Sequence, residues 1–455
     1  MNTVVLLPSI TDSYFDPFLN KITKDFENDD LIFIYPYSYF EEYGYQSILQ
    51  PFNFFRNLRK FIRRRLLKNN RLKKIEADIV RYDSVWNECL IFLFGLVFAK
   101  FDIGLKNIDT KNYYFVNTAI RFFNIYDISK INRWQLNILN FRIFDLKRQS
   151  KNFISNKSIE IDRIILNYLV YMNNVIFVES IKVKENVKIL TFAEGQYNIV
   201  DIACGSGILH NDVIDYYKGN FNMDIQNIIE KNKTIINNRF KGKIDLAINY
   251  ERTKKFDMFI DLNSFLKTNK IVHPNFIILF LHDFYDSPHY CGHLGFVDYW
   301  NWVQSCLSIF KSYNTNYTLI IKPHPNSDNL DKALSKIKLE VQDNENIIFL
   351  EEFINNDFLM NILKPKVILT LTGTIILESI LMGIEVICLK NNPVKNFNLN
   401  IGFDSELDYL QKLKSVLLNN DNEFICLQNL DEENRAFYIM NYLRPVFPFN
   451  ISNLL

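Results

Sequence analysis

The segment VILTLTGTIILESILMGIEVICL (367–389) predicts two buried strands joined by a polar turn and a helix. The apolar run 367–371 stops at the polar residues 372–374, where a helix is expected to begin and to continue as far as Gly383. A second buried strand is predicted at 385–389. Strand, helix and strand in this order form a βαβ unit, whose two strands are parallel. The segment therefore indicates an open α/β sheet, in which ligands bind at the carboxyl ends of the strands.

The same alternation of strands and helices precedes this segment. FIILFLHDF (276–284) and YTLIIK (317–322) are predicted strands, and the helix predicted between them at 296–312 repeats its apolar residues every three or four positions. Further predicted elements continue the pattern: a helix near 329–338, a strand at 346–350 and a helix near 355–363. Successive parallel strands with crossover helices predict a doubly wound sheet.

The N-terminal half predicts a second α/β domain. Its expected elements are strands at 4–8, 31–36, 174–180 and 187–195 and a helix near 15–27. Residues 53–150 differ from these in being aromatic, basic and helix-like, and they are expected to form a helical insertion. The predicted domains are residues 1–265 and 266–455.

Composition excludes several classes of protein. The chain has 455 residues, an apolar fraction of 48% and a formal net charge of +1, which exclude a disordered protein and one that coats nucleic acid. The six cysteines contain no CxxC pair, so neither a disulfide framework nor a zinc knuckle is indicated. The apolar run in MNTVVLLPS is too short for a signal peptide, and a cytoplasmic location is expected.

A basic segment at 54–74 bears on the location. It carries ten Lys or Arg residues and no acid, with Phe and Leu interleaved at roughly helical spacing. A basic amphipathic helix of this type can lie on an anionic membrane surface, here the inner face of the cytoplasmic membrane. A solvated helix with one face in the core explains the pattern equally well. The candidate membrane contacts are Arg63, Arg64 and Arg65. The apolar run 89–99 is too short to span a bilayer and predicts a buried helix.

Polar residues gather where the C-terminal strands are predicted to end. A helix N-terminus near Thr374 would offer amide groups to a phosphate, and Glu378, one turn further along the same helix face, could hold a ribose hydroxyl. The strand-end side chains are expected to point into solvent or ligand. The candidate nucleotide-binding residues are His282, Lys322, His324, Pro325, Thr372, Gly373, Thr374 and Glu378. Each could also have a purely structural role, and it is their order on successive strand ends that favours binding.

Three motifs resemble a known family. LHDFYDSPHYCGHLGFVDYWNWV (281–303), LIIKPHP (319–325) and TLTGTIILESILMG (370–383) resemble, in this order, the capsule polysaccharide biosynthesis glycosyltransferases, which include bacterial transferases of CMP-activated Kdo. The His-Pro element is similar to that of bacterial GT-B sialyltransferases. The resemblance covers roughly residues 175–445. It implies a GT-B-like fold in which two Rossmann-like domains face a central cleft, with the acceptor on the N-terminal side and the nucleotide-sugar on the C-terminal side.

The resemblance also implies partners and catalytic roles. The donor would be a nucleotide-sugar, with a CMP-linked sugar favoured, and the acceptor a growing surface or capsular polysaccharide or a glycolipid. His324 matches the histidine that contacts the donor phosphate. Glu194, followed by Gly195, is the nearest match to the acidic-Gly motif that supplies the catalytic base. No metal and no other cofactor are expected, because GT-B enzymes stabilise the phosphate with basic side chains and a helix N-terminus.

Asp283, Asp286 and His289 lie in the loop that follows the strand at 276–284. They are expected either to contact the acceptor or to satisfy the turns of the loop. A cluster of His and Asp residues can also hold a metal, but neither HxH nor HExxH spacing is present.

Two other functions compete with glycosyl transfer. IVDIACGSG (199–207) looks like the first motif of S-adenosylmethionine-dependent methyltransferases, and Asp224 could be the ribose-binding acid of such an enzyme. A single glycine-rich turn is a weak signal, however, and in the glycosyltransferase interpretation residues 197–203 are expected to begin a helix. The basic segment alone would also suit a non-catalytic, membrane-associated assembly protein that binds no nucleotide.

Overall fold

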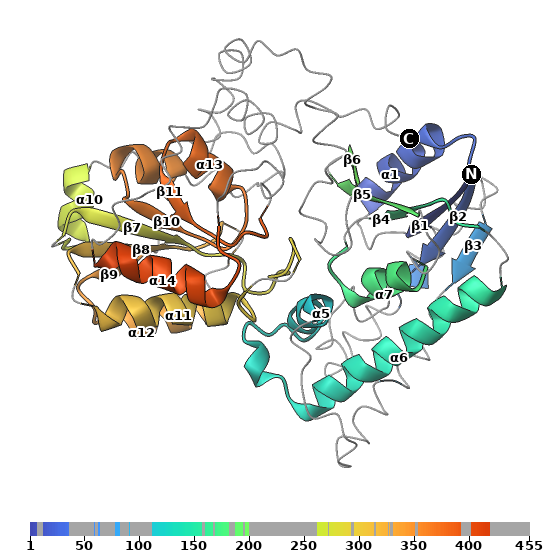
Figure 1. Cartoon of the computed structure of the whole chain (residues 1–455), viewed down its shortest axis with the longest axis horizontal. Helices are drawn as coiled ribbons and strands as arrows, with labels where there is room; N and C mark the ends of the chain where they lie inside the picture. The colour runs from blue at the N-terminus through green and yellow to red at the C-terminus, as the bar shows by residue number, and fades with distance from the viewer. Residues whose placement is uncertain are drawn as a thin grey trace, which may run out of the picture. The chain divides into compact units, whose positions relative to one another are not determined.

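The computed structural model forms two compact units (Figure 1). It describes residues 1–6, 12–35, 59, 62–63, 78–81, 91, 112–156, 160–166, 169–181, 187–193, 196–199, 262–271, 273–292, 295–313, 315–325, 327, 331–350, 354–392 and 402–418. Of these, unit 1 contains the residues up to 199 together with 285–292, and unit 2 contains 262–284 and 295–418. Unit 1 thus includes residues 285–292, which belong to the C-terminal half of the chain.

Unit 1 is built on a six-stranded sheet with the order β3-β2-β1-β4-β5-β6. Its strands are β1 (Asn2–Leu6), β2 (Asp30–Tyr35), β3 (Asp78–Arg81), β4 (Arg163–Leu166), β5 (Lys188–Ala193) and β6 (Gln196–Ile199). All neighbouring strands pair in parallel except β6, which runs antiparallel to β5. The helices are α1 (Asp12–Asp25), α5 (Tyr113–Phe123), α6 (Arg133–Asn156) and α7 (Met172–Ile181), with a 3-10 turn, η2 (Ile128–Lys130). The described central strands β1 and β4 are almost wholly buried, as expected where helices cover both faces of a parallel sheet.

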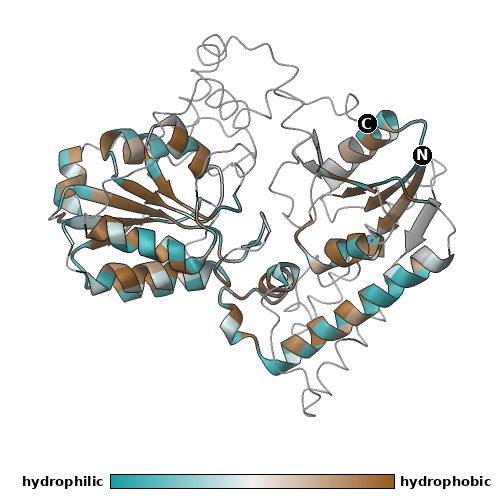
Figure 2. Cartoon of the chain, viewed as in Figure 1, coloured by the Kyte–Doolittle hydropathy of each residue, from teal (hydrophilic) through white to brown (hydrophobic). Residues whose placement is uncertain are grey.

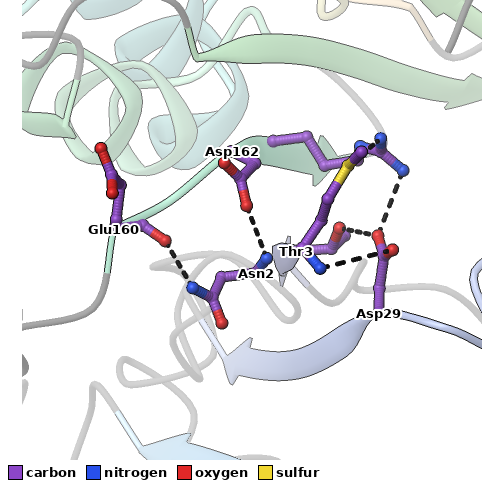
Figure 3. A network of polar contacts seen from close by, with 7 residues as sticks. Asn2, Thr3, Asp29, Glu160 and Asp162 are labelled. Atoms are coloured by element: carbon purple, nitrogen blue, oxygen red, sulfur yellow. Dashed lines mark hydrogen bonds and ion pairs between the residues drawn. The ribbon is translucent and has the colours of Figure 1, made fainter.

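The amino ends of β1 and β4 are held by a network of polar contacts (Figure 3). Asp29, just before β2, accepts hydrogen bonds through Oδ2 from Thr3 Oγ1 at 2.5 Å and from Arg163 Nη1 at 3.1 Å. The Asn2 backbone nitrogen donates to Asp162 Oδ2 at 2.7 Å. The side chain of Arg163 is buried and that of Asp29 is only 10% exposed, so water screens this ion pair weakly. These contacts connect the amino ends of β1 and β4 to the residue that precedes β2.

Unit 2 is built on a five-stranded parallel sheet with the order β11-β10-β7-β8-β9. Its strands are β7 (Asn275–Phe280), β8 (Tyr317–Lys322), β9 (Ile347–Phe349), β10 (Val367–Leu369) and β11 (Glu385–Ile387). The helices are α10 (Leu262–Thr268), α11 (Tyr299–Ser312), α12 (Lys332–Val341), α13 (Ile375–Leu381) and α14 (Glu406–Leu417), with a π-helical turn, η5 (Phe358–Ile362). Helices α11, α12 and α14 lie on one side of the sheet and α13 on the other (Figure 1), and the apolar strands between them form the core (Figure 2).

The order of the strands in unit 2 defines a position for a ligand. The chain adds β8 and then β9 on one side of β7, and returns to the other side of β7 with β10 and β11. The direction of winding therefore reverses between β7 and β10. In open α/β sheets such a reversal opens a crevice at the carboxyl ends of the two strands, and ligands bind there.

The predicted fold class is confirmed, because each unit is a Rossmann-like, mainly parallel sheet with helices. Residues 317–322 form β8 as predicted, and the strand, turn and helix of 367–382 appear as β10, the turn and α13. The expectation that the two domains face a central cleft stays a prediction, as does the boundary at residue 265.

Three expectations for the N-terminal half were wrong. Residues 174–180, predicted as a strand, lie in α7, because a short run that is apolar all round occurs in buried helices as well as in buried strands. The segment 53–150 is not purely helical, since β3 lies within it and pairs with β2. Residues 197–199, predicted to begin a helix, belong to β6.

Several predicted features fall largely outside the described residues. Of the basic segment 54–74, only residues 59, 62 and 63 are described, and these are helical and exposed. The apolar run 89–99 is described only at residue 91. Among the helices that the structure describes, none is both long and apolar enough to cross a membrane.

Candidate functional site

The candidate site lies at the carboxyl ends of three neighbouring strands of unit 2. Because β7 lies between β10 and β8, the residues after these strands meet at one edge of the sheet. His282 follows β7, Lys322 ends β8 and is followed closely by His324, and the turn 370–374 follows β10. His324 is close enough to His282 to disfavour a charge on it electrostatically, so the structure brings together residues that lie far apart in sequence.

Lys322 is the last residue of β8 and is more buried than a strand-end lysine was expected to be, with 6% of its surface exposed. Its Nζ lies 5.1 Å from the centre of the Phe280 ring. Burial lowers the pKa of Lys322 to about 8, although the nearby charge of Glu378 acts in the opposite direction. Among the described residues no carboxylate forms an ion pair with it. Burying an unpaired cation lowers the stability of a protein, and pairing it with an anionic ligand offsets that loss.

His282 lies against the turn that follows β10. Its Nε2 is 3.2 Å from Thr370 Oγ1 and 3.5 Å from the Thr372 backbone nitrogen. Its ring stacks on Tyr299 of α11, with the ring centres 4.4 Å apart and the planes 8° from parallel. Burial, assisted by the charge of His324, lowers the pKa of His282 to about 3. His282 is therefore neutral at physiological pH.

The turn after β10 contains a glycine with a positive φ and an exposed threonine. Gly373 has a φ of 101°, a conformation that is open to glycine and rarely to other residues. Thr372 is buried, whereas Thr374 is exposed at the residue before α13 and makes no capping hydrogen bond with its side chain. The hydroxyl of Thr374 is thus available to a ligand at this edge.

Glu378 of α13 lies inside unit 2 with 4% of its surface exposed. Its Oε2 accepts a hydrogen bond from Asn356 Nδ2. Its charge favours the protonated form of Lys322, which is a role that the sequence did not predict. A contact between Glu378 and a ribose stays a prediction.

The turn after β8 contains the remaining candidates of this unit. His324 and Pro325 are partly exposed, and the Ser327 backbone nitrogen donates to His324 O at 2.9 Å. This bond closes the turn and fixes the main chain of His324 beside the end of β8.

The loop candidates are divided between the two units. Asp283 belongs to unit 2, whereas Asp286 and His289 belong to the segment of unit 1. The Asp286 carboxylate lies 3.8 Å from Arg121 Nη1 at the surface, and the buried His289 donates its backbone N–H to Asn117 Oδ1 at 3.0 Å. Asp286 and His289 thus anchor the loop to α5. In the part of the chain that the structure describes, no group of three His, Cys, Asp or Glu side chains could hold a metal ion.

The predicted base lies outside the described residues, because Glu194 and Gly195 follow the last described residue of β5. Arg64 and Arg65 also lie outside them, and Arg63 is exposed. The sequence did not point to four residues that contact the candidate site: Thr370 after β10, Tyr299 of α11, Asn356 before η5 and Tyr409 of α14. Only Thr370 had a local signal, since it lies two residues before the predicted phosphate turn.

Comparisons with known proteins give only distant similarities. No protein-family model and no curated protein matches the chain. A structure of UDP-GlcNAc 2-epimerase from Neisseria meningitidis bound to UDP-GlcNAc aligns over 98% of this chain and 100% of its own, at 9% identity and a TM-score of 0.30. The Anabaena protein HepE in complex with UDP-glucose aligns over 100% of this chain and 97% of its own, at 10% identity and a TM-score of 0.29.

A third similar structure is the C-terminal domain of a glycosyl transferase group 1 family protein from Francisella tularensis. It covers 43% of this chain and 98% of its own, at 13% identity and a TM-score of 0.25. TM-scores of this size are too low to carry conclusions about this chain.

Proposed function

We propose that the protein is a glycosyltransferase that moves a sugar from a nucleotide-activated donor to a glycan or glycolipid acceptor. The observation that carries the proposal is Lys322, a buried lysine at a strand end, next to the position where the strand order reverses between β7 and β10, with no ion-pair partner among the described residues. A phosphate group of a donor would add a negative charge to that of the nearby Glu378 and pair with the ammonium group. CMP is the favoured nucleotide because of the resemblance of the His-Pro element to CMP-sugar transferases.

The residues of unit 2 would stabilise the leaving nucleotide. Negative charge develops on its phosphate as the bond to the sugar breaks, and preorganised donors in a site shielded from water stabilise such a charge strongly. The Lys322 ammonium group, the imidazole of His324 and the hydroxyl of Thr374 are the donors that we assign to this role. Gly373 has no Cβ atom, so the main chain at this residue could approach the phosphate closely.

The acceptor hydroxyl must lose a proton if the sugar is transferred with inversion. Glu194 remains the candidate base, since it follows β5 of unit 1 directly. This assignment rests on the acidic-Gly pattern of the sequence alone. A surface or capsular polysaccharide remains the proposed acceptor on the same basis as the CMP donor.

The geometry of β6 disfavours the methyltransferase alternative. A glycine-rich turn that binds S-adenosylmethionine must start at the carboxyl edge of a parallel sheet. β6, which ends at Ile199 where the glycine-rich motif begins, runs antiparallel to β5. β6 therefore ends, at the first residue of the motif, toward the edge where the parallel strands have their amino ends.

The proposal is tested by adding nucleotides to the full-length protein in a thermal-shift screen. CMP, CDP, UDP, GDP and S-adenosylmethionine are each compared with no ligand, since any compound that binds only the native state raises the melting temperature. We expect a rise with CMP or CDP, and loss of that rise in Lys322→Ala. Stabilisation by S-adenosylmethionine alone would favour the methyltransferase, and stabilisation by none of the five would favour a non-catalytic protein.

A further inference from the structure

His282 makes contacts within unit 2 that leave little of its ring for a ligand. Tyr299 covers one face of the ring, Thr370 and Thr372 lie at Nε2, and a Cβ atom placed on Gly373 would lie 3.6 Å from Cε1. The ring therefore packs directly beneath the turn that is proposed to bind the phosphate.

Thr370 is held in place by hydrogen bonds between its backbone and neighbouring elements. Its backbone nitrogen donates to Ile387 O of β11 at 3.1 Å, and its backbone oxygen accepts from Tyr409 Oη of α14 at 3.2 Å. Thr370 is completely buried, and the peptide groups before and after it are each hydrogen-bonded to a neighbouring element.

The hydroxyl of Thr370 connects His282 to the turn. Thr370 Oγ1 donates its single hydrogen to Thr372 O at 3.0 Å. The 3.2 Å contact with His282 Nε2 must then be a bond that the imidazole donates. The 3.5 Å contact with the Thr372 nitrogen would need the opposite state of Nε2, and it is at the limit of a hydrogen bond. The result is a relay from His282 through Thr370 to the carbonyl group that precedes Gly373.

We infer that His282 and Thr370 are positioning residues that hold the turn 372–374 in its ligand-binding conformation through this relay. The inference rests on the proposed function and deepens it. The peptide between Thr372 and Gly373 is oriented by the relay, and glycine at φ 101° has little conformational preference of its own to hold it there. Without the relay, the turn would have to be ordered at the moment of binding, and affinity would fall by the fraction of time that the turn spends in other conformations.

Four single variants separate positioning from direct contact. His282→Phe keeps the aromatic stack on Tyr299 but removes the donor, whereas His282→Gln keeps an amide donor near the position of Nε2. Thr370→Val removes the hydroxyl at constant shape, whereas Thr370→Ser keeps it. Binding of CMP and of UDP is measured by calorimetry for each variant, for the double variant His282→Phe/Thr370→Val and for Lys322→Ala.

We expect His282→Phe and Thr370→Val each to weaken nucleotide binding about three- to tenfold, the value of one neutral hydrogen bond. His282→Gln and Thr370→Ser should stay within about twofold of the unaltered protein. The double variant should be no weaker than the weaker single variant, because both changes break one relay. The inference is overturned if the losses of affinity in the two single variants multiply in the double variant. It is also overturned if His282→Gln loses affinity while Thr370→Ser keeps it. Either result would show that His282 contacts the ligand independently of Thr370.

Hydrogen exchange of the backbone amides of residues 371–376 tests, in the ligand-free protein, whether the relay orders the turn. Exchange should be faster in His282→Phe and Thr370→Val and unchanged in His282→Gln and Thr370→Ser. Unchanged exchange in all four variants would overturn the inference. If Lys322→Ala loses nucleotide binding and Thr370→Val does not, the inference about the relay is overturned and the proposed function stands. Absence of binding by the unaltered protein would overturn the proposed function, and exchange would still decide whether the relay orders the turn.

Discussion

At the scale of the residue, the candidate site contains a group that is expected to lower the stability of the fold. Lys322 is buried without an ion pair among the described residues. Such a feature persists where it serves a function, because an uncharged residue of similar size would give a more stable protein.

Lys322→Met should therefore stabilise the protein while abolishing nucleotide binding. Methionine fills a similar volume without a charge, and we expect a gain of about 1 kcal/mol or more in the free energy of unfolding near neutral pH. Urea denaturation checks the gain, and Lys332→Met, at an exposed position at the start of α12, serves as the control with no change in stability or binding. Equal or lower stability of Lys322→Met would show that the lysine is not strained in its site.

The difference between Lys322→Met and the unaltered protein should depend on pH in a defined direction. The pKa of Lys322 is lowered from 10.5 to about 8 in the folded protein. Between these two pKa values the unfolded chain binds more protons at this residue than the native protein does. The free energy of unfolding of the unaltered protein therefore rises with pH in this range. Denaturation between pH 7 and 10.5 should show the advantage of the methionine variant shrinking as pH rises. A constant difference would mean that Lys322 titrates normally.

Nucleotide affinity should show the opposite trend for the same reason. A phosphate binds the protonated amine, so affinity should fall as pH rises through about 8, the pKa of Lys322. Lys322→Arg should remove this fall, since a guanidinium keeps its charge. Calorimetric titration at pH 7, 8 and 9 measures both proteins, and an unaltered pH profile in the arginine variant would assign the effect to another group.

Glycine at position 373 should matter for binding more than glycine at the other end of α13. Gly373→Ala and Gly383→Ala both place a Cβ atom on a residue with positive φ, 101° and 66° respectively. Each should lower stability by about 1 kcal/mol. Only Gly373→Ala should weaken nucleotide binding, since Gly383 ends the helix away from the strand ends. Equal binding by both variants would exclude the turn 372–374 from the site.

At the scale of the element, the strands of unit 2 were predictable and several elements of unit 1 were not. The residues of β8 and β10 are apolar runs that stop at polar turns, and such boundaries are read directly from local sequence. The helix α7 carries the same kind of apolar run, and only its packing decides its conformation. The site was predictable to the same extent: Lys322 and the turn mark strand ends, whereas Tyr409 reaches the site from α14 and carries no local signal.

Asp29 connects the amino ends of β1 and β4 by accepting hydrogen bonds from Thr3 and Arg163. This structural role can be tested. Asp29→Ala should lower the free energy of unfolding by about 3 kcal/mol, because it leaves the buried guanidinium of Arg163 without its partner. Urea denaturation measures the loss, and nucleotide binding by unit 2 should persist. The double variant Asp29→Leu/Arg163→Met should recover much of the loss, since it removes both charges. A small loss in Asp29→Ala would show that water reaches this pair.

At the scale of the whole molecule, the basic segment 54–74 is the feature that connects the proposed chemistry to a location. A lipid-linked acceptor would be reached most easily by an enzyme held at an anionic surface, and each cation near such a surface contributes about 1 kcal/mol. The protein should sediment with anionic vesicles at low salt and remain in solution at high salt. Charge reversal of Arg63, Arg64 and Arg65 should abolish the sedimentation and leave nucleotide binding intact. Sedimentation that does not respond to salt would exclude this mechanism.

The assignment of residues 285–292 to unit 1 limits how the protein can be divided or recombined. A chimera that exchanged everything after residue 265 for the corresponding part of another protein would also replace Ser287 and His289, which bond to Tyr171 and Asn117. An exchange of unit 2 alone therefore needs two further junctions, one on each side of this segment. The recipient then keeps its own eight residues at 285–292. Grafts made with a single junction should be recovered in lower soluble yield than grafts that respect the segment.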